Sequence, residues 1–368
     1  MGLREHPLGV KRIVGIILAV LLIGGVITAV VAGRESQVSD TATKTVRGVI
    51  GSEKAEFFAD PDVIKALDEH GFTVKTETSG SWAMEEQLTL EETDFAFPSS
   101  TAPADELAKK FKVPGTPLRP FYSPLVVVAH RAAAQVLADN GLATLDGKSR
   151  GTLRMGPYLD AAAEQRTWQQ LKGTAGHAEL TGTVFITSTD PMTSNSGALY
   201  LAAASFVANG GKVVGDKKAV DQTAPLLKQL TVVQGSQQPS SDAPFRDFIS
   251  GVGNPLVLVY ESQVASVLLQ KQEVGDLVVL YPDTTVNSDH TLVPFNENGR
   301  ALGDLLTTDK RLRELAVRHG FRPQGAAAEF TAATAPYQDF LNQTLTGVRQ
   351  APVPTTEWLH AMAQRARS

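Results

Sequence analysis

The chain has 368 residues, a formal net charge of -5 and no cysteine. This length is too great for one typical hydrophobic core and suits two lobes or domains. The acidic balance gives no basic face for nucleic acid, so we expect no nucleic-acid partner. The lack of cysteine excludes disulfides, thiolate metal sites and a cysteine nucleophile.

An uncharged apolar segment lies near the N-terminus. Residues 13–33 (IVGIILAVLLIGGVITAVVAG) are long enough to cross a bilayer as a helix. Three Lys or Arg residues precede this segment and only Arg34 follows closely, so the positive-inside rule places residues 1–12 in the cytoplasm. A cleavable signal peptide ending near residues 30–32 is the alternative, but the apolar run is longer than a usual signal-peptide core. We therefore predict a single-pass signal anchor in the cell membrane, with the C-terminal domain extracellular.

After a polar linker over residues 34–44, the pattern changes to strands and helices. Residues 45–50 (TVRGVI) predict a strand, followed by the turn GSEK and a helix over residues 57–69. Residues 72–77 (FTVKTE) predict a second strand, which ends in the small polar turn TSGS. This order is typical of a parallel βαβ unit. In such sheets, ligands bind at the carboxyl ends of the strands.

The pattern repeats along the chain. Further strands are predicted over residues 93–97, 123–130, 183–186, 255–260 and 277–281. Further helices are predicted over residues 105–111, 132–140, 161–168, 220–230, 243–251, 261–270 and 302–318. Three prolines between residues 114 and 120 are expected to prevent regular structure there. A last helix follows residue 350, on a tail that we expect to be loosely attached.

A polar turn followed by an apolar helix occupies residues 187–211 (TSTDPMTSNSGALYLAAASFVANGG). The helix is predicted from about Ser196 to Asn209, because Asn and the following glycines accept the left-handed conformation that ends helices. Its first turn carries unpaired N–H groups at the positive end of the helix dipole, beside the hydroxyls of Thr193 and Ser194. Such a turn can bind an anion without a basic side chain; alternatively, its serines act only as helix caps.

Motifs of catalysis and metal binding are missing from the sequence. The DGKS stretch at residues 146–149 lacks the glycine spacing of a phosphate-binding loop, and residues 251–253 (GVG) lack the third glycine of a dinucleotide fingerprint. No GxSxG elbow occurs, and the seven histidines have no metal-ligand spacing. We therefore expect no enzyme activity, catalytic residue, metal or cofactor.

The order of the remaining motifs resembles the type II periplasmic binding-protein fold. The segments that carry this resemblance are GSEK, TSGS, FPSST, SPLVVVAH, TSTDPMTSNSG, VYESQ and VVLYPDTT. Within that fold, residues 45–323 look most like the extracellular solute-binding family related to the molybdate, sulfate and phosphate binders. The fold class predicted is therefore α/β, a two-lobed type II periplasmic-binding-protein fold preceded by one transmembrane helix.

The resemblance implies two lobes with a ligand cleft between them. Lobe 1 would be residues 45–123 with 274–349, lobe 2 residues 124–273, and a C-terminal tail residues 350–368. Residues 124–128 and 280–284 would form the hinge, whose closure would bury the ligand.

The resemblance also implies a ligand site at the strand ends and helix starts. Its residues would be Ser52, Ser79, Ser81, Ser99, Ser100, Ser194, Ser196, Tyr260 and Glu261. Hydroxyls and backbone N–H groups suit an ionised oxyanion, because they donate hydrogen bonds and add no charge. Each serine can instead be a simple turn former, and Tyr260 a core aromatic. Glu261 would repel an anion unless Lys or Arg pairs with it, so either it points into the hinge or the ligand is cationic or zwitterionic.

Two functions from different classes are consistent with these features. The resemblance implies a membrane-tethered extracellular solute-binding protein that captures a small solute, such as an oxyanion, for transport or sensing. Its partners would be the small-molecule ligand, the membrane and a transporter permease. The alternative is an interaction or scaffold protein of the cell envelope that retains the fold without a small ligand.

Overall fold

The computed structural model describes residues 43–367. The predicted cytoplasmic N-terminus, the membrane helix and nearly all of the linker lie outside the described residues. Within residues 43–367, no helix is both long enough and apolar enough to span a membrane.

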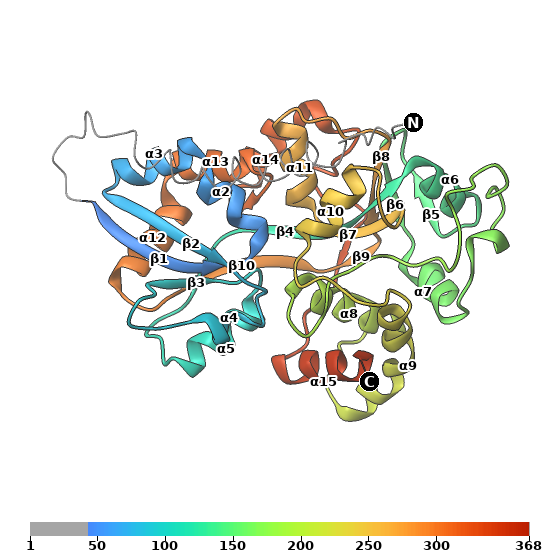
Figure 1. Cartoon of the computed structure of the whole chain (residues 1–368), viewed down its shortest axis with the longest axis horizontal. Coiled ribbons are helices and arrows are strands. Elements are labelled where there is room, and N and C mark those ends of the chain that lie inside the picture. Colours follow the sequence, from blue (N-terminus) through green and yellow to red (C-terminus); the bar gives the residue numbers. More distant parts are fainter. Residues whose placement is uncertain (1–42, 368) are drawn as a thin grey trace, which may run out of the picture. The chain divides into compact units, whose positions relative to one another are not determined.

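A ten-stranded mixed sheet runs through this part of the chain (Figure 1). Its main path has the order β2-β1-β3-β10-β4-β8-β6-β5, and β7 and β11 also pair with β4. These strands are β1 (Lys44–Ile50), β2 (Phe72–Thr78), β3 (Phe95–Phe97), β4 (Leu118–His130), β5 (Ala143–Leu145), β6 (Arg150–Leu153), β7 (Leu256–Tyr260), β8 (Leu277–Pro282), β10 (Asn287–Pro294) and β11 (Arg322–Pro323). A separate parallel pair joins β9 (Thr284–Thr285) and β12 (Arg349–Gln350).

Helices cover the sheet and fill the connections between strands. The α-helices are α2 (Ala55–Ala59), α3 (Pro61–Glu69), α4 (Met84–Gln87), α5 (Thr101–Lys110), α6 (Arg131–Asp139), α7 (Met155–Ala163), α8 (Asn195–Ala208), α9 (Lys217–Val232), α10 (Asp242–Ile249), α11 (Glu261–Leu269), α12 (Glu297–Thr308), α13 (Lys310–Arg318), α14 (Ala327–Thr334) and α15 (Thr356–Arg367). Short 3-10 turns form η1 (Ser52–Lys54), η2 (Trp168–Gln170) and η3 (Ala335–Tyr337).

The long strand β4 connects two groups of strands. Its first half pairs with β10 and β11, and its second half pairs with β7 and β8. Separate hydrophobic clusters lie on the two sides: one contains Phe57, Phe95 and Phe121, and another contains Tyr158 and Tyr200. This arrangement matches a two-lobed α/β protein. The lobe boundaries and hinge segments inferred from the sequence stay predictions.

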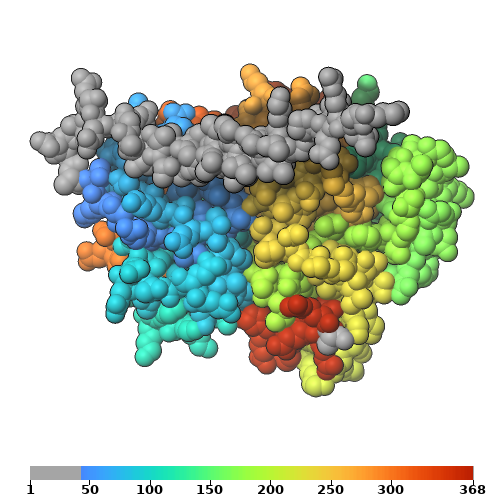
Figure 2. Space-filling model, viewed as in Figure 1, coloured from blue at the N-terminus to red at the C-terminus, as the bar shows by residue number. Residues whose placement is uncertain are grey.

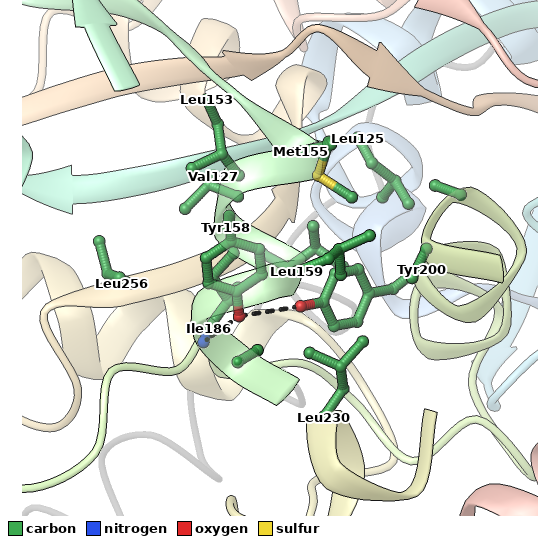
Figure 3. Packing of buried hydrophobic residues seen from close by; sticks show 14 of the residues in the cluster. Leu125, Val127, Leu153, Met155, Tyr158, Leu159, Ile186, Tyr200, Leu230 and Leu256 are labelled. Carbon is green, nitrogen blue, oxygen red and sulfur yellow. Dashed lines mark hydrogen bonds between the residues drawn. The ribbon is translucent and has the colours of Figure 1, made fainter. Parts of the chain in front are cut away.

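Helix α8 is the central helix of its cluster. Twelve of its 14 residues are buried, which explains why its sequence is apolar on every face and not on one stripe. The Tyr200 hydroxyl lies 3.1 Å from that of Tyr158, which accepts a hydrogen bond from the Ile186 N–H (Figure 3). Burial raises the pKa of Tyr158 to about 12. These contacts fix α8 and therefore the position of its N-terminal turn.

Several elements differ from the sequence predictions. The helix predicted over residues 302–318 is interrupted at Asp309, whose carboxylate accepts the Leu312 N–H at 2.8 Å and caps α13. The helix predicted over residues 161–168 begins earlier, at Met155. The strand predicted over residues 183–186 is absent, and only isolated bridges occur at its ends.

Two predictions about irregular segments were wrong. The prolines between residues 114 and 120 were predicted to prevent regular structure, but strand β4 begins at Leu118 and contains Pro120. The pairing of β4 with β10 is irregular between His290 and Leu292, and this irregularity leaves room for a residue without an N–H. The C-terminal tail is firmly packed: α15 lies against α9 and α8, with the side chains of Leu359 and Met362 buried. Figure 2 shows this red helix seated on the yellow-green segment that contains α9.

Candidate functional site

A small cavity lies where the carboxyl ends of β1, β3 and β7 meet the N-terminus of α8. Of the residues predicted for the site, it is lined by Ser52, Ser79, Ser81, Ser99, Ser194 and Tyr260. The cavity volume is about 10 Å³, which is enough for one water molecule at most. The sequence thus identified side chains that the fold brings together, although the space between them is nearly filled.

The turn before α8 is closed by its own hydroxyls. Ser194 is the N-cap residue, and the Ser196 hydroxyl lies 2.7 Å from that of Thr189. The Gly197 N–H donates to the Thr189 hydroxyl at 2.8 Å. A side chain at Gly197 would approach the Thr189 carbonyl oxygen to 2.2 Å, so this close approach requires glycine. Ser196 therefore holds the turn in place and does not line the cavity.

Asn195 connects the other predicted residues and is absent from the sequence-based set. Its amide donates to the hydroxyls of Tyr260, at 3.0 Å, and Ser288, at 3.2 Å. Its carbonyl oxygen accepts from the Ser100 hydroxyl at 2.5 Å. Ser100 consequently contributes to the site through Asn195 and not as a lining residue. The position of Asn195 between Ser194 and Ser196, at the start of the helix, was the available sequence signal.

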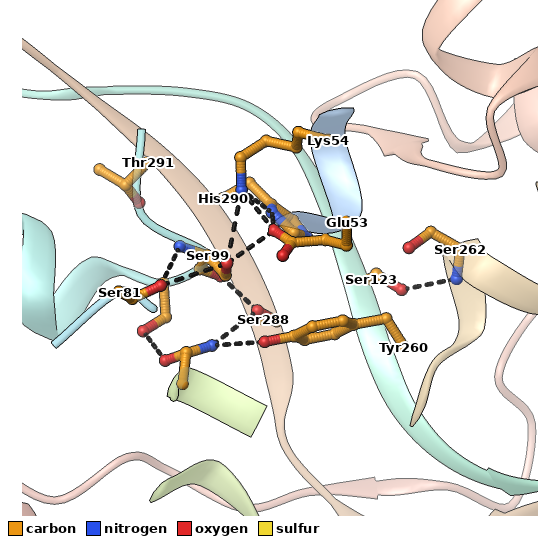
Figure 4. Close-up of polar contacts among 12 residues, drawn as sticks. Glu53, Lys54, Ser81, Ser99, Ser123, Tyr260, Ser262, Ser288, His290 and Thr291 are labelled. Atoms are coloured by element: carbon orange, nitrogen blue, oxygen red, sulfur yellow. Dashed lines mark hydrogen bonds and ion pairs between the residues drawn. The ribbon is translucent and has the colours of Figure 1, made fainter. Parts of the chain in front are cut away.

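A buried charge cluster forms one wall of the cavity (Figure 4). The Glu53 carboxylate accepts hydrogen bonds from the Lys54 ammonium and, at 2.6 Å, from the Ser99 hydroxyl. The His290 Nδ1 lies 3.2 Å from Glu53 Oε1 and 3.2 Å from Lys54 Nζ. The Lys54 and His290 side chains are fully buried, and the Glu53 side chain is 4% exposed. The Ser81 hydroxyl accepts the Ser99 N–H at 2.9 Å, which links this cluster to the second loop.

The members of the cluster shift one another's pKa values. Burial alone would raise the pKa of Glu53, but the charge of Lys54 and the hydrogen bond with His290 outweigh burial and lower it. Burial lowers the pKa of Lys54, against the opposing charge of Glu53. Burial and the charge of Lys54 lower the pKa of His290 to about 4. At neutral pH the cluster therefore contains a carboxylate and a neutral imidazole.

The depressed pKa of His290 predicts a specific loss of stability in acid. The unfolded chain takes up this proton near pH 6.5, but the folded chain takes it up only near pH 4. The stabilising contribution is therefore complete above pH 6.5 and is lost as the pH falls toward 4. By linkage it amounts to roughly 3 kcal/mol. Urea unfolding across this range should show a flatter pH dependence for His290→Gln than for the native chain. An equal slope would contradict this assignment.

Glu261 lies outside the cavity lining. Its carboxylate accepts two hydrogen bonds from the Arg322 guanidinium, at 2.5 and 2.8 Å, and one from the Tyr281 hydroxyl at 2.5 Å. Glu261 is fully buried and Arg322 is 2% exposed. The basic partner that the sequence argument required is thus Arg322, 61 positions away. This ion pair ties α11 to β11 and places no charge in the cavity.

The two-lobed arrangement is the fold of periplasmic solute-binding proteins. The sulfate-binding protein SubI from Mycobacterium tuberculosis H37Rv matches with a TM-score of 0.53 and 15% identity, covering 86% of this chain and 96% of its own. A ferric binding protein from Campylobacter jejuni matches with a TM-score of 0.55 and 11% identity, covering 88% and 98%. A periplasmic thiamin binding protein matches with a TM-score of 0.53 and 14% identity, covering 91% and 100%.

These similarities confirm the resemblance to binding proteins at the level of the fold. The finer relation to molybdate and phosphate binders stays a prediction. No family model and no curated protein matches the sequence. Within residues 43–367, no group of three or more His, Asp or Glu side chains is arranged to hold a metal ion.

Proposed function

We propose that this chain is an extracellular solute-binding protein, tethered to the membrane by the helix predicted over residues 13–33. It captures a small solute in the serine-lined cavity and passes it to a transporter permease or reports its presence. The observation that carries this proposal is the convergence of hydroxyl and amide groups from four separate chain segments: Ser79 and Ser81, Ser99, Ser194 and Asn195, and Tyr260. The shared fold of proteins whose names state sulfate, thiamin and iron binding supports it.

An oxyanion is the solute class that these groups favour. The hydroxyls that line the cavity lie beside the first N–H groups of α8, at the positive end of a helix, where an anion is favoured. The cavity of about 10 Å³ does not admit such a solute as it stands. Entry requires the two lobes to separate or the Glu53 carboxylate to move away from Ser99. In the described state, Glu53 accepts the hydrogen bond of the Ser99 hydroxyl, which an anion would otherwise accept.

Thermal unfolding of the full-length chain in detergent tests this function. The probes are sulfate, phosphate, molybdate and thiamin, each added separately. A solute at about 100 times its Kd stabilises the folded state by about 2.7 kcal/mol, which corresponds to a rise in Tm of several degrees. We expect such a rise with at least one oxyanion. No change with any probe would contradict the oxyanion class.

Removing the charge of Glu53 tests whether this carboxylate competes with a bound oxyanion. Because Glu53 competes with an anion for the same donors, Glu53→Gln should bind a responding oxyanion at least about tenfold more tightly than the native chain. Glu77→Gln, which removes an exposed carboxylate at the end of β2, is the matched control and should leave Kd unchanged. Equal or weaker binding of that oxyanion by Glu53→Gln would contradict this competition. Isothermal titration measures both affinities.

One observation favours the scaffold alternative. The cavity is nearly filled by side chains, and the Glu53–Lys54 pair satisfies its own charges without a ligand. In a scaffold protein this cluster would be a permanent structural element. A flat thermal response to all probes, together with unchanged stability in the Ser79→Ala variant, would favour this second function.

A further inference from the structure

A second and larger cavity lies beside the charge cluster. Its volume is about 380 Å³, and it lies between η1 and α2 on one side and α10 and α11 on the other, next to His319. It shares only Ser52 and Glu53 with the serine-lined cavity. A volume of this size accommodates a small organic molecule. The proposed capture of an oxyanion does not involve this larger cavity.

One wall of this cavity is apolar. It consists of Phe245 and Ile249 from α10 and Val267 from α11. Phe245 belongs to a hydrophobic cluster, and Ile249 and Val267 pack against it, so the wall is held rigidly by the core behind it. Such a surface favours a ligand with an apolar body of a few carbon atoms.

The lining of this cavity also carries carboxylates. Asp242, at the start of α10, is half-buried, and its carboxylate accepts a hydrogen bond from the Gln263 amide at 3.0 Å. No Lys, Arg or His side chain in residues 43–367 forms an ion pair with Asp242 within 4.0 Å. Burial raises the pKa of Asp242, and the nearby charge of Glu53 adds to this effect, against the hydrogen bond from Ser52. A cationic group in the cavity would supply the missing counter-charge.

Other charged groups on the lining supply that counter-charge only in part: the charge of Arg246 opposes the rise in the pKa of Asp242, but no ion pair joins the two side chains within 4.0 Å. Arg246 is exposed, and the His319 imidazole lies 2.7 Å from the Asp60 carboxylate. Glu56, which is exposed, adds another negative charge to the lining. The lining therefore attracts a single positive charge and repels an anion.

A buried hydroxyl without a partner also faces this cavity. The Ser262 side chain is on the lining, the residue is 2% exposed, and its hydroxyl has no hydrogen-bond partner within the described part of the chain. Its backbone N–H is already used, because it donates to the Ser123 hydroxyl at 2.9 Å. Figure 4 shows the Ser262 hydroxyl directed to the side on which Glu53 lies. A buried hydroxyl that lacks a partner costs free energy, which a ligand with a hydrogen-bond donor would recover.

We propose that this cavity is a separate binding site for a small primary amine with an apolar body. The ammonium group pairs with the Asp242 carboxylate and donates a hydrogen bond to the Ser262 hydroxyl. The apolar body lies against Phe245, Ile249 and Val267. The site stands independently of the oxyanion proposal, because its ligand class is different and only Ser52 and Glu53 belong to both linings.

Isothermal titration of the full-length chain in detergent tests this site with three matched probes at about pH 7.5. These probes are phenethylamine, which is protonated; 2-phenylethanol, which is neutral; and phenylacetate, which is an anion. We expect phenethylamine to bind with a Kd below about 1 mM, 2-phenylethanol at least about tenfold more weakly, and phenylacetate not to bind. Equal binding of all three probes, or no binding of phenethylamine at about 10 mM, would overturn the proposal.

Two variants locate the site. Asp242→Asn retains an oxygen for the Gln263 amide and removes the charge, so we expect phenethylamine to bind at least about tenfold more weakly. Asp247→Asn, an exposed position on the same helix outside the lining, should bind it as the native chain does. Ser250→Trp, at the exposed rim, should block the cavity and abolish binding. Unchanged affinity in both Asp242→Asn and Ser250→Trp would refute the location. Asp242 and Ser250 do not line the serine-lined cavity, so a change in phenethylamine binding without a change in the oxyanion response would locate the amine site in the larger cavity.

Discussion

Replacing Lys54 with methionine is expected to lower the free energy of unfolding by about 3–5 kcal/mol, because removal of one member of a buried ion pair leaves the other charge uncompensated. The Lys54 side chain is fully buried, and its ammonium is the only Lys or Arg partner of Glu53 within the described residues. The Ser99 hydroxyl and the neutral His290 imidazole carry no positive charge. Urea unfolding at pH 7 measures the loss.

A second variant separates the lost charge from the lost packing. In Glu53→Gln combined with Lys54→Met, neither charge remains, so most of the loss should be recovered. Lys217→Met, which breaks an exposed pair with Asp221, is the matched control and should leave the free energy of unfolding nearly unchanged. A double variant that is less stable than Lys54→Met would contradict the ion-pair explanation.

The substitution Arg322→Met should have an effect of similar size, about 3–5 kcal/mol. It leaves the Glu261 carboxylate buried without a cation and removes the donors to the carbonyl oxygens of Asn342 and Gln343. The cation also lies over the Phe330 ring, 4.1 Å from its centroid. Thermal and urea unfolding should both report the loss.

The matched comparison for Arg322 is Arg313. Arg313 forms two hydrogen bonds with Glu329, but its side chain is 21% exposed and that of Glu329 is 29% exposed. Because water solvates the carboxylate that remains, Arg313→Met should cost no more than about 1 kcal/mol. Equal losses in the two variants would show that burial of the Glu261 pair is not the cause.

The sequence predicted the loops of the site because their signals are local. Small polar residues directly after β1, β2 and β3 place Ser52, Ser79, Ser81 and Ser99 at one edge of the sheet, whatever the rest of the fold does. The N-terminus of α8 was predicted within one residue, because a polar turn before an apolar run and an Asn-Gly-Gly end are strong signals. These features required no knowledge of long-range contacts.

The charge cluster could not be predicted in this way. GSEK has the composition of an exposed turn, yet Lys54 and the side chain of Glu53 are buried because Ser99 and His290 reach them from distant positions. Strand β10 was missed because its buried residues include the polar Ser288 and His290, whose hydroxyl and imidazole contact the site, so the segment lacks an apolar run. Long-range polar partners leave no periodic signal in a sequence.

Native mass spectrometry of the full-length chain tests the central claim most directly. The chain would be mixed with sulfate, phosphate, molybdate and thiamin, and compared with its Asn195→Ala variant. We predict one adduct per chain for the native protein, retained by Asp247→Asn and lost from Asn195→Ala, since Asn195 joins Tyr260 and Ser288 across the serine-lined cavity. The bare mass alone in every mixture, or an adduct that survives in Asn195→Ala, would contradict the claim that this cavity captures a solute.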